Sequence, residues 1–276
     1  MLVSAFESKK IDYDFIVVSS FETIMFVIGR YFFKKDDKII LFHHFNTDEL
    51  NNKIKAWFFR RYMNKVTHIV FAEFIKDYLI NNFDINPKKI FVMPHHMNII
   101  DENTTMKKEF DCVGLSNSND EEIISEILQK EKQEKVFKKM GCKVVLKSKI
   151  HEFDDGYLKI VKGYLEKEVF DNYINNTQSI YMPFPSSFQY RMSGTLIDAL
   201  SNGKIVYGSD IPVMRYYSKR HPNICKVVDN ADSFINKLLN KKDNISDYTK
   251  DFERFKQEHS EEKIEGVFRK IFNSIQ

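Results

Sequence analysis

The chain has 276 residues, enough for about two domains, and 43% of them are hydrophobic, which excludes a disordered protein. Its 42 basic and 39 acidic residues nearly balance, and a net charge of +3 argues against a general nucleic-acid binder. The three cysteines are widely spaced and form neither a zinc pattern nor a disulfide framework. Since the sequence also shows no signal peptide and no apolar run of membrane-spanning length, we expect a cytoplasmic protein.

The first hundred residues alternate short β-branched runs with helix patterns. This alternation is typical of βαβ units around a parallel sheet. The expected strands span residues 14–18, 38–42, 68–71 and 89–93, and the expected helices span 20–33, 48–64 and 73–82. A polar linker follows at 101–109 and marks the expected domain boundary.

A second series of strands and helices fills the rest of the chain. The expected strands span 110–113, 143–146, 158–161, 179–182, 204–207 and 225–228. The expected helices span 120–140, 166–175, 196–201, 213–220, 231–240, 248–259 and 262–275. The whole pattern predicts an α/β protein with two parallel-sheet domains.

The stretch 179–206 contains the clearest functional pattern, a strand, a polar loop and a helix start at Ser193-Gly194-Thr195. The free N–H groups and the dipole of a helix N-terminus can hold a phosphate. Arg191 could add a full charge, and Asp198 could accept hydrogen bonds from a ribose diol. The same pattern also describes an ordinary capped helix.

The segment 198–206, Asp-Ala-Leu-Ser-Asn-Gly-Lys-Ile-Val, resembles the donor-binding helix of retaining GT-B glycosyltransferases. Asp198 stands in place of the second Glu of that family's motif, and Tyr190 stands where its first Glu is expected. The run from 191 to 199 resembles a branch of bacterial surface-polysaccharide glycosyltransferases. The resemblance covers the second domain almost completely and the first in part, because no glycine-rich loop follows a first strand.

The resemblance implies two Rossmann-like domains: an incomplete acceptor-side domain at 1–104, a nucleotide-sugar domain at 105–261, and a last helix, 262–276, that crosses back to the first domain. It implies transfer of a hexosyl unit from a nucleotide-diphosphate sugar to a saccharide or lipid-linked acceptor in polysaccharide biosynthesis, with no cofactor and no required metal. In the implied donor site Asp198 binds the ribose, the amides of Ser193, Gly194 and Thr195 bind the diphosphate with Arg191, and Tyr190 lies near the sugar.

Two further pairs are candidates for this site. His43 and His44 follow the strand 38–42, at the carboxyl edge where ligands bind in open α/β sheets. The resemblance implies that one of them faces the donor sugar, and the sequence does not choose between them. Lys147 and Lys149 alternate at a strand end and could replace the family's missing Arg/Lys pair, or both could be solvated. His95 and His96 lack further ligands at a suitable spacing, so we expect no metal site.

The basic and aromatic helix 52–64 has two interpretations. It could lie on an anionic membrane surface, which would make the protein peripheral to the inner face of the membrane. It could instead pack on the sheet with its lysines in water, which is the favoured interpretation. Two other functions also stay open: a catalytically silent GT-B-like subunit that partners an active glycosyltransferase, and a sugar-nucleotide epimerase, for which no cleft carboxylates can be identified.

Overall fold

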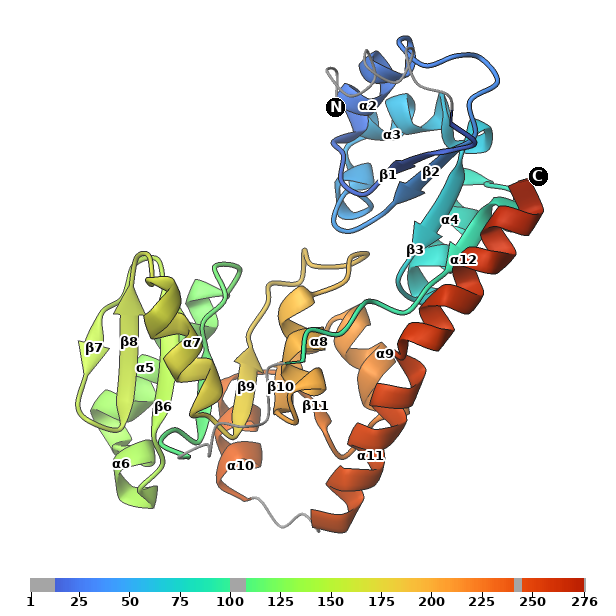
Figure 1. The fold of residues 1–276 in the computed structure, drawn as a ribbon. Coiled ribbons are helices and arrows are strands. Elements are labelled where there is room, and N and C mark those ends of the chain that lie inside the picture. Colours follow the sequence, from blue (N-terminus) through green and yellow to red (C-terminus); the bar gives the residue numbers. More distant parts are fainter. Residues whose placement is uncertain (1–12, 100–107, 241–244, 276) are drawn as a thin grey trace. The chain divides into compact units, whose positions relative to one another are not determined.

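The structure is a computed structural model that describes residues 13–99, 108–240 and 245–275. The described residues form two compact units (Figure 1). The first unit is built from residues within 1–96, 189–192 and 258–276, and the second from residues within 97–188 and 193–257. Each unit contains a parallel sheet with helices packed on it, so the predicted α/β class is confirmed.

The sheet of the first unit has four described strands in the order β1-β2-β3-β4, all parallel. They are β1 Ile16–Val18, β2 Ile39–Phe42, β3 Thr67–Val70 and β4 Ile90–Val92. The helices that connect them are α2 Thr23–Arg30, α3 Lys53–Arg60 and α4 Glu73–Phe83. Each strand is added on the same side of the one before it, and crossover connections between parallel strands are right-handed. The three connecting helices therefore all lie on one face of the sheet.

The C-terminal helix α12, Glu261–Ile275, covers the other face of this sheet. Phe42 and His43 are adjacent at the end of β2 and therefore point to opposite faces. The Phe42 ring lies 6.1 Å from that of Phe268 in α12, whereas the His43 ring lies 6.2 Å from that of Phe59 in α3. The sheet is thus sandwiched between helices from opposite ends of the sequence.

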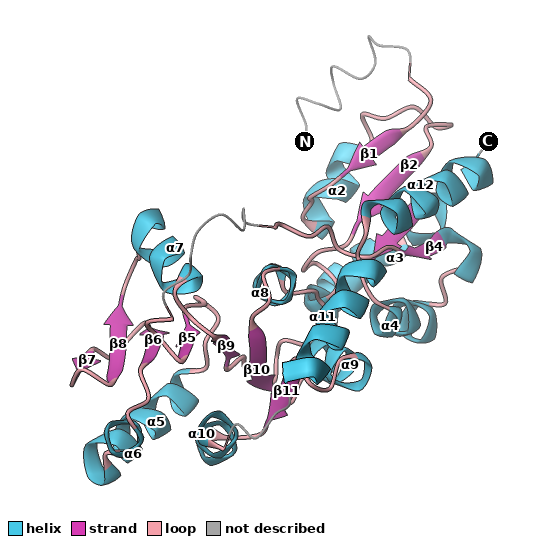
Figure 2. Cartoon of the chain, turned by 60° about the horizontal axis from the view of Figure 1, so that its bottom comes forward, coloured by secondary structure: helices cyan, strands magenta, loops and turns pink. Residues whose placement is uncertain are grey.

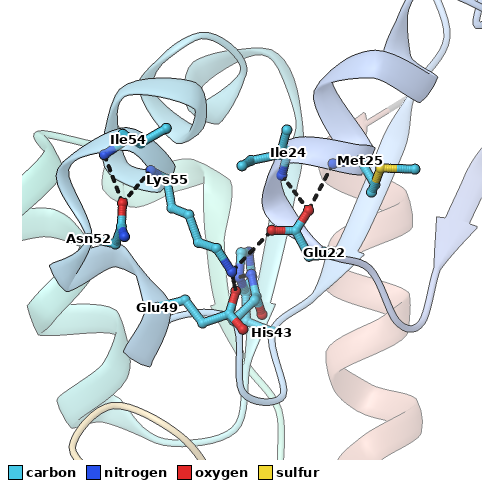
Figure 3. Close-up of polar contacts among 9 residues, drawn as sticks. Glu22, Ile24, Met25, His43, Glu49, Asn52, Ile54 and Lys55 are labelled. Atoms are coloured by element: carbon cyan, nitrogen blue, oxygen red, sulfur yellow. Dashed lines mark hydrogen bonds and ion pairs between the residues drawn. The ribbon is translucent and has the colours of Figure 1, made fainter.

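Two helices of the first unit differ from the sequence prediction because side chains cap the backbone at unexpected places. Helix α2 begins at Thr23, not at Ser20, since the Glu22 carboxylate accepts hydrogen bonds from the amides of Ile24 and Met25 (Figure 3). The predicted helix 48–64 is divided into the 3₁₀ turn Asp48–Asn51, α3 and the 3₁₀ turn Met63–Lys65. The division occurs at Asn52, which is extended and caps α3.

The second unit contains seven described strands in the order β11-β10-β9-β5-β6-β8-β7, seen from below in Figure 2. They are β5 Cys112–Gly114, β6 Val144–Ser148, β7 Phe153–Asp154, β8 Leu158–Lys162, β9 Ser179–Met182, β10 Ile205–Ser209 and β11 Cys225–Val228. All pairings are parallel except that of β7 with β8. The helices are α5 Glu121–Glu134, α6 Val136–Met140, α7 Lys167–Asn175, α8 Gly194–Ser201, α9 Pro212–Arg220, α10 Ala231–Leu239 and α11 Ile245–Glu258.

The sequence missed two features of the second unit. The predicted helix 120–140 is broken at Lys135, whose φ is 53°, and the buried carboxylate of Glu131 accepts hydrogen bonds from the amides of Phe137 and Lys138 after the break. The two-residue strand β7 is too short to give an alternating pattern.

Of the predicted linker 101–109, residues 101–107 lie outside the described residues. Among those that are described, no helix is long and apolar enough to cross a lipid bilayer.

Candidate functional site

The chain order of the second sheet reverses between β5 and β9. From β5 the chain continues through β6 and β8 on one side, and β9, β10 and β11 follow on the other. Loops that leave such a point diverge and open a crevice at the carboxyl ends of the strands, where ligands bind in open α/β sheets. Gly114, the last residue of β5, permits the close approach, because a Cβ there would lie 2.9 Å from the Tyr181 carbonyl oxygen.

A pocket of about 270 Å³ lies at this reversal point. The loop after β5, helix α7, strand β9 and helix α8 all contribute to its lining, which consists of Leu115, Ser116, Asn117, Ser118, Phe170, Ile174, Ile180 and Thr195. Two contacts fix the loop: the Asp120 amide donates to the Pro183 carbonyl at 2.6 Å, and the Asn119 side chain donates to the carbonyls of Gly114 and Lys147. Hydrogen bonds therefore hold in place the backbone that borders the pocket.

The N-terminus of α8 borders this pocket through Thr195. Ser193 is the N-cap, and its hydroxyl accepts the Leu196 amide at 3.3 Å. The amides of Gly194 and Thr195 donate to no group within the described part of the chain. Asp198 lies exposed one turn further along the same helix. Four residues predicted for the donor site thus share one helix end, whose amides are available to an anion.

Lys147 and Lys149 lie at the carboxyl end of β6 and line an adjoining pocket of about 280 Å³. The two pockets have Ser116 and Asn117 in common. Lys147 is only 8% exposed, and among the described residues no acceptor or carboxylate pairs with its ammonium group. Lys147 therefore brings to this pocket a positive charge that an anionic ligand could pair with. Lys149 is exposed beside it.

The structure separates the two vicinal histidines of the first unit. His43 is fully buried, and its Nε2 lies 2.8 Å from Nδ1 of His68, a residue that the sequence analysis did not single out. The His43 Nδ1 contacts the Asn46 amide, and His68 Nε2 contacts the Met63 carbonyl. Burial lowers the pKa of both imidazoles, for His68 to about 4. His43 is therefore an internal, neutral part of the core.

His44 is half-buried at the carboxyl edge of the first sheet. Its ring centroid lies 4.8 Å from that of Phe71 and 6.2 Å from that of His95. Burial, helped by the proximity of His95, lowers its pKa, so that a neutral imidazole is present at neutral pH. Of the two candidate histidines, His44 is the one with an accessible ring. Among the described residues no group of His, Cys, Asp and Glu side chains could hold a metal.

Tyr190 and Arg191 belong to the first unit, in the segment Gln189–Met192. The Tyr190 ring stacks on that of Tyr78, with centroids 3.6 Å apart. The Asp48 carboxylate accepts hydrogen bonds from the amides of Gln189 and Tyr190, and its Oδ2 lies 2.8 Å from Arg191 Nε. The Arg191 charge thus has a partner carboxylate 143 residues earlier in the chain.

No protein-family model matches the sequence, and no curated protein matches it either. Solved structures match the fold. TarM has a TM-score of 0.65 at 16% identity, over 99% of this chain and 57% of TarM. Sucrose-phosphate synthase of Thermosynechococcus elongatus has a TM-score of 0.66 at 12% identity, over 99% and 77% of the two chains. Anabaena HepE, solved with UDP-glucose, has a TM-score of 0.64 at 8% identity, over 99% and 82%.

These likenesses confirm the predicted fold, two Rossmann-like domains of the GT-B type. The chain spans little more than half the length of TarM. At identities of 8% to 16%, the comparisons concern the fold alone.

Proposed function

We propose that this chain is a retaining glycosyltransferase that moves a hexosyl unit from a nucleotide-diphosphate sugar to a saccharide or lipid-linked saccharide acceptor in polysaccharide biosynthesis. The observation that carries the proposal is Lys147, a largely buried side chain at the carboxyl edge of the second sheet that lines a pocket and has no ion-pair partner among the described residues. It lies in a pocket that adjoins the one bordered by α8. A diphosphate would supply the missing negative charge.

In the proposed reaction the bond between the sugar C1 and the diphosphate oxygen breaks, and the nucleoside diphosphate leaves with the electron pair. The acceptor hydroxyl oxygen bonds to C1 with the original anomeric configuration, and its proton leaves on the departing phosphate. Lys147, Lys149 and the Gly194 and Thr195 amides stabilise the charge that develops on the leaving group, and Asp198 holds the ribose. No metal or cofactor is part of the proposal.

The first unit contributes His44 in this proposal. Its neutral imidazole can donate or accept one hydrogen bond with a sugar hydroxyl. Tyr190 and Arg191, which the resemblance places on the donor, contact Tyr78 and Asp48, and these contacts can orient the segment before α8. We therefore assign these two residues a positioning role.

A second candidate is a catalytically silent subunit that partners an active glycosyltransferase. Two observations favour it: Tyr190 occupies a position where the family's motif has a Glu, and its ring is engaged with Tyr78. The chain would then keep the fold and bind its partner without turning over a donor.

Calorimetric titration with UDP and GDP tests the donor site. We expect micromolar binding of one nucleotide, weakened about 10- to 100-fold by Lys147→Met, since a hydrogen bond to a charged group contributes about 1.5–3 kcal/mol. Asp198→Ala should weaken binding as well. Two substitutions at exposed positions are the matched controls. They are Lys139→Met, near the C-terminal end of α6, and Glu134→Ala, at the C-terminal end of α5. Unchanged affinity in both site variants would overturn the site.

Turnover separates the two candidate functions. Nucleotide release from UDP-sugar or GDP-sugar donors in the presence of saccharide acceptors, with a product of unchanged anomeric configuration by NMR, supports the transferase. Nucleotide binding without release for any donor supports the silent subunit. Absence of binding for both UDP and GDP contradicts the transferase.

A further inference from the structure

Helices α2 and α3 of the first unit present large apolar side chains to solvent. Packing on the sheet, the favoured interpretation of the sequence, accounts only for Ala56 and Phe59 on α3. Ile54 and Trp57 on the same helix are 63% and 50% exposed. On and just after α2, four more large apolar residues are exposed, namely Met25, Ile28, Tyr31 and Phe32.

These side chains belong to the solvent-exposed parts of two neighbouring helices. Met25 and Ile28 are three residues apart, as are Ile54 and Trp57, so each pair forms a stripe along its helix. The two helices pack directly against each other. A groove of about 670 Å³ runs between them and is lined by Val27, Arg30, Tyr31, Phe33, Lys35, Trp57, Phe58, Arg61, Tyr62 and Lys65. We call this surface, with its groove and its exposed side chains, the α2–α3 face.

The α2–α3 face is strongly basic. Residues 23–35 and 53–65 contain eight Lys and Arg residues and no Asp or Glu, in a chain that is otherwise almost balanced. Lys55 does not count toward the free charge, because its ammonium group lies between the carboxylates of Glu22 and Glu49 (Figure 3). The exposed cations are Lys34, Lys35, Lys53, Arg60, Arg61 and Lys65.

Few carboxylates offset this charge. Asp36 and Asp37 follow Lys35 directly, and Asp37 accepts hydrogen bonds from the Lys34 amide and the Tyr13 hydroxyl. The Arg61 guanidinium lies 4.1 Å from the centre of the Trp57 ring, so a cation and an aromatic ring are presented together. The face therefore combines a positive field with apolar side chains that water solvates poorly.

We propose that the α2–α3 face docks on an anionic lipid bilayer. Basic residues near such a surface are attracted by its negative potential, while Trp, Tyr and aliphatic side chains enter the headgroup region. Both requirements are met on one face of one unit. A nucleic acid would satisfy the charges but leave Ile54 and Met25 without an apolar partner. The proposal does not depend on the glycosyltransferase assignment.

Co-sedimentation with vesicles tests the proposal on the full chain. The probes are vesicles of equal parts phosphatidylglycerol and phosphatidylcholine, and vesicles of phosphatidylcholine alone. We expect binding to the anionic vesicles that weakens with added salt, and little binding to the neutral ones. Arg61→Ser combined with Lys65→Ser should weaken it about 30-fold, since each basic residue near the surface contributes a factor of about five.

A second pair of variants separates the apolar contribution from the charge. Ile54→Ser with Trp57→Ser keeps every charge, and because both positions are half-exposed or more, we expect the fold to be preserved. This variant should also lose binding to anionic vesicles. The matched control is Lys263→Ser with Lys270→Ser, which removes two exposed charges from α12 on the other face of the sheet. Equal losses in the control and the Arg61/Lys65 variant, or equal binding to the anionic and the neutral vesicles, would overturn the proposal.

Discussion

The buried histidine pair makes the stability of the first unit depend on pH. Burial lowers the pKa of His68 from 6.5 to about 4 and holds that of His43 well below its usual range. In the unfolded chain both imidazoles take up protons near pH 6.5. Because the unfolded state then binds more protons than the folded state, stability that is present above pH 6.5 is lost as the pH falls toward 4.

The size of this effect follows from the shift. For one group with an unfolded pKa of about 6.5 and a folded pKa of about 4, the free energy of unfolding falls by about 2 kcal/mol between pH 7 and pH 5. His43 adds to the loss in the same direction. Urea titration measures it through the fluorescence of Trp57, which is the only tryptophan and lies in the first unit.

A variant isolates the pair from other titrating groups. His68→Gln keeps a polar side chain in place of the imidazole and removes its titration, so the loss between pH 7 and pH 5 should shrink by about 2 kcal/mol. His96→Gln, at an exposed position, should leave that loss unchanged. The reasoning is refuted if His68→Gln loses as much stability as the parent chain over this range.

Two further changes test local features of the two units. Glu22→Ala removes the cap of α2 and one partner of Lys55, and should lower the free energy of unfolding by about 1 kcal/mol in the same urea titration; an unchanged midpoint would mean that the cap does not stabilise α2. Gly114→Ala places a Cβ 2.9 Å from the Tyr181 carbonyl and should cost about 1–3 kcal/mol, measured by thermal unfolding. Gly266→Ala, in α12 with open space around its Cα, is the matched control and should not destabilise.

The alternation of strands and helices could be predicted because buried parallel strands leave continuous apolar runs that loops interrupt. The start of α8 could also be predicted, because serine is a preferred N-cap residue and Ser193 caps the helix. Other boundaries depend on a choice among several polar residues. Glu22 caps α2 although Ser20 is the commoner cap type, and Asn52 divides a helix whose flanking residues favour its continuation. Composition alone does not decide such competition.

The candidate site was predictable in part, for a related reason. Residues on α8 are close in sequence, so one pattern reveals them together. The loop that completes the pocket, with Ser116 and Ser118, comes from a distant strand and has no charge to draw attention to it. Likewise, nothing in the sequence links His43 to His68, although their ring nitrogens lie 2.8 Å apart in the fold.

The distribution of charge decides which cation would hold a diphosphate. Arg191 is paired with Asp48, and releasing it would leave that half-buried carboxylate without its counter-charge. Lys149 is exposed, so water already solvates its charge. Lys147 differs from both, because its side chain is largely buried at the pocket and has no ion-pair partner among the described residues, so a phosphate can pair with it without breaking an ion pair. Donor affinity should therefore reside at the carboxyl end of β6, with the α8 amides as the second point of attachment.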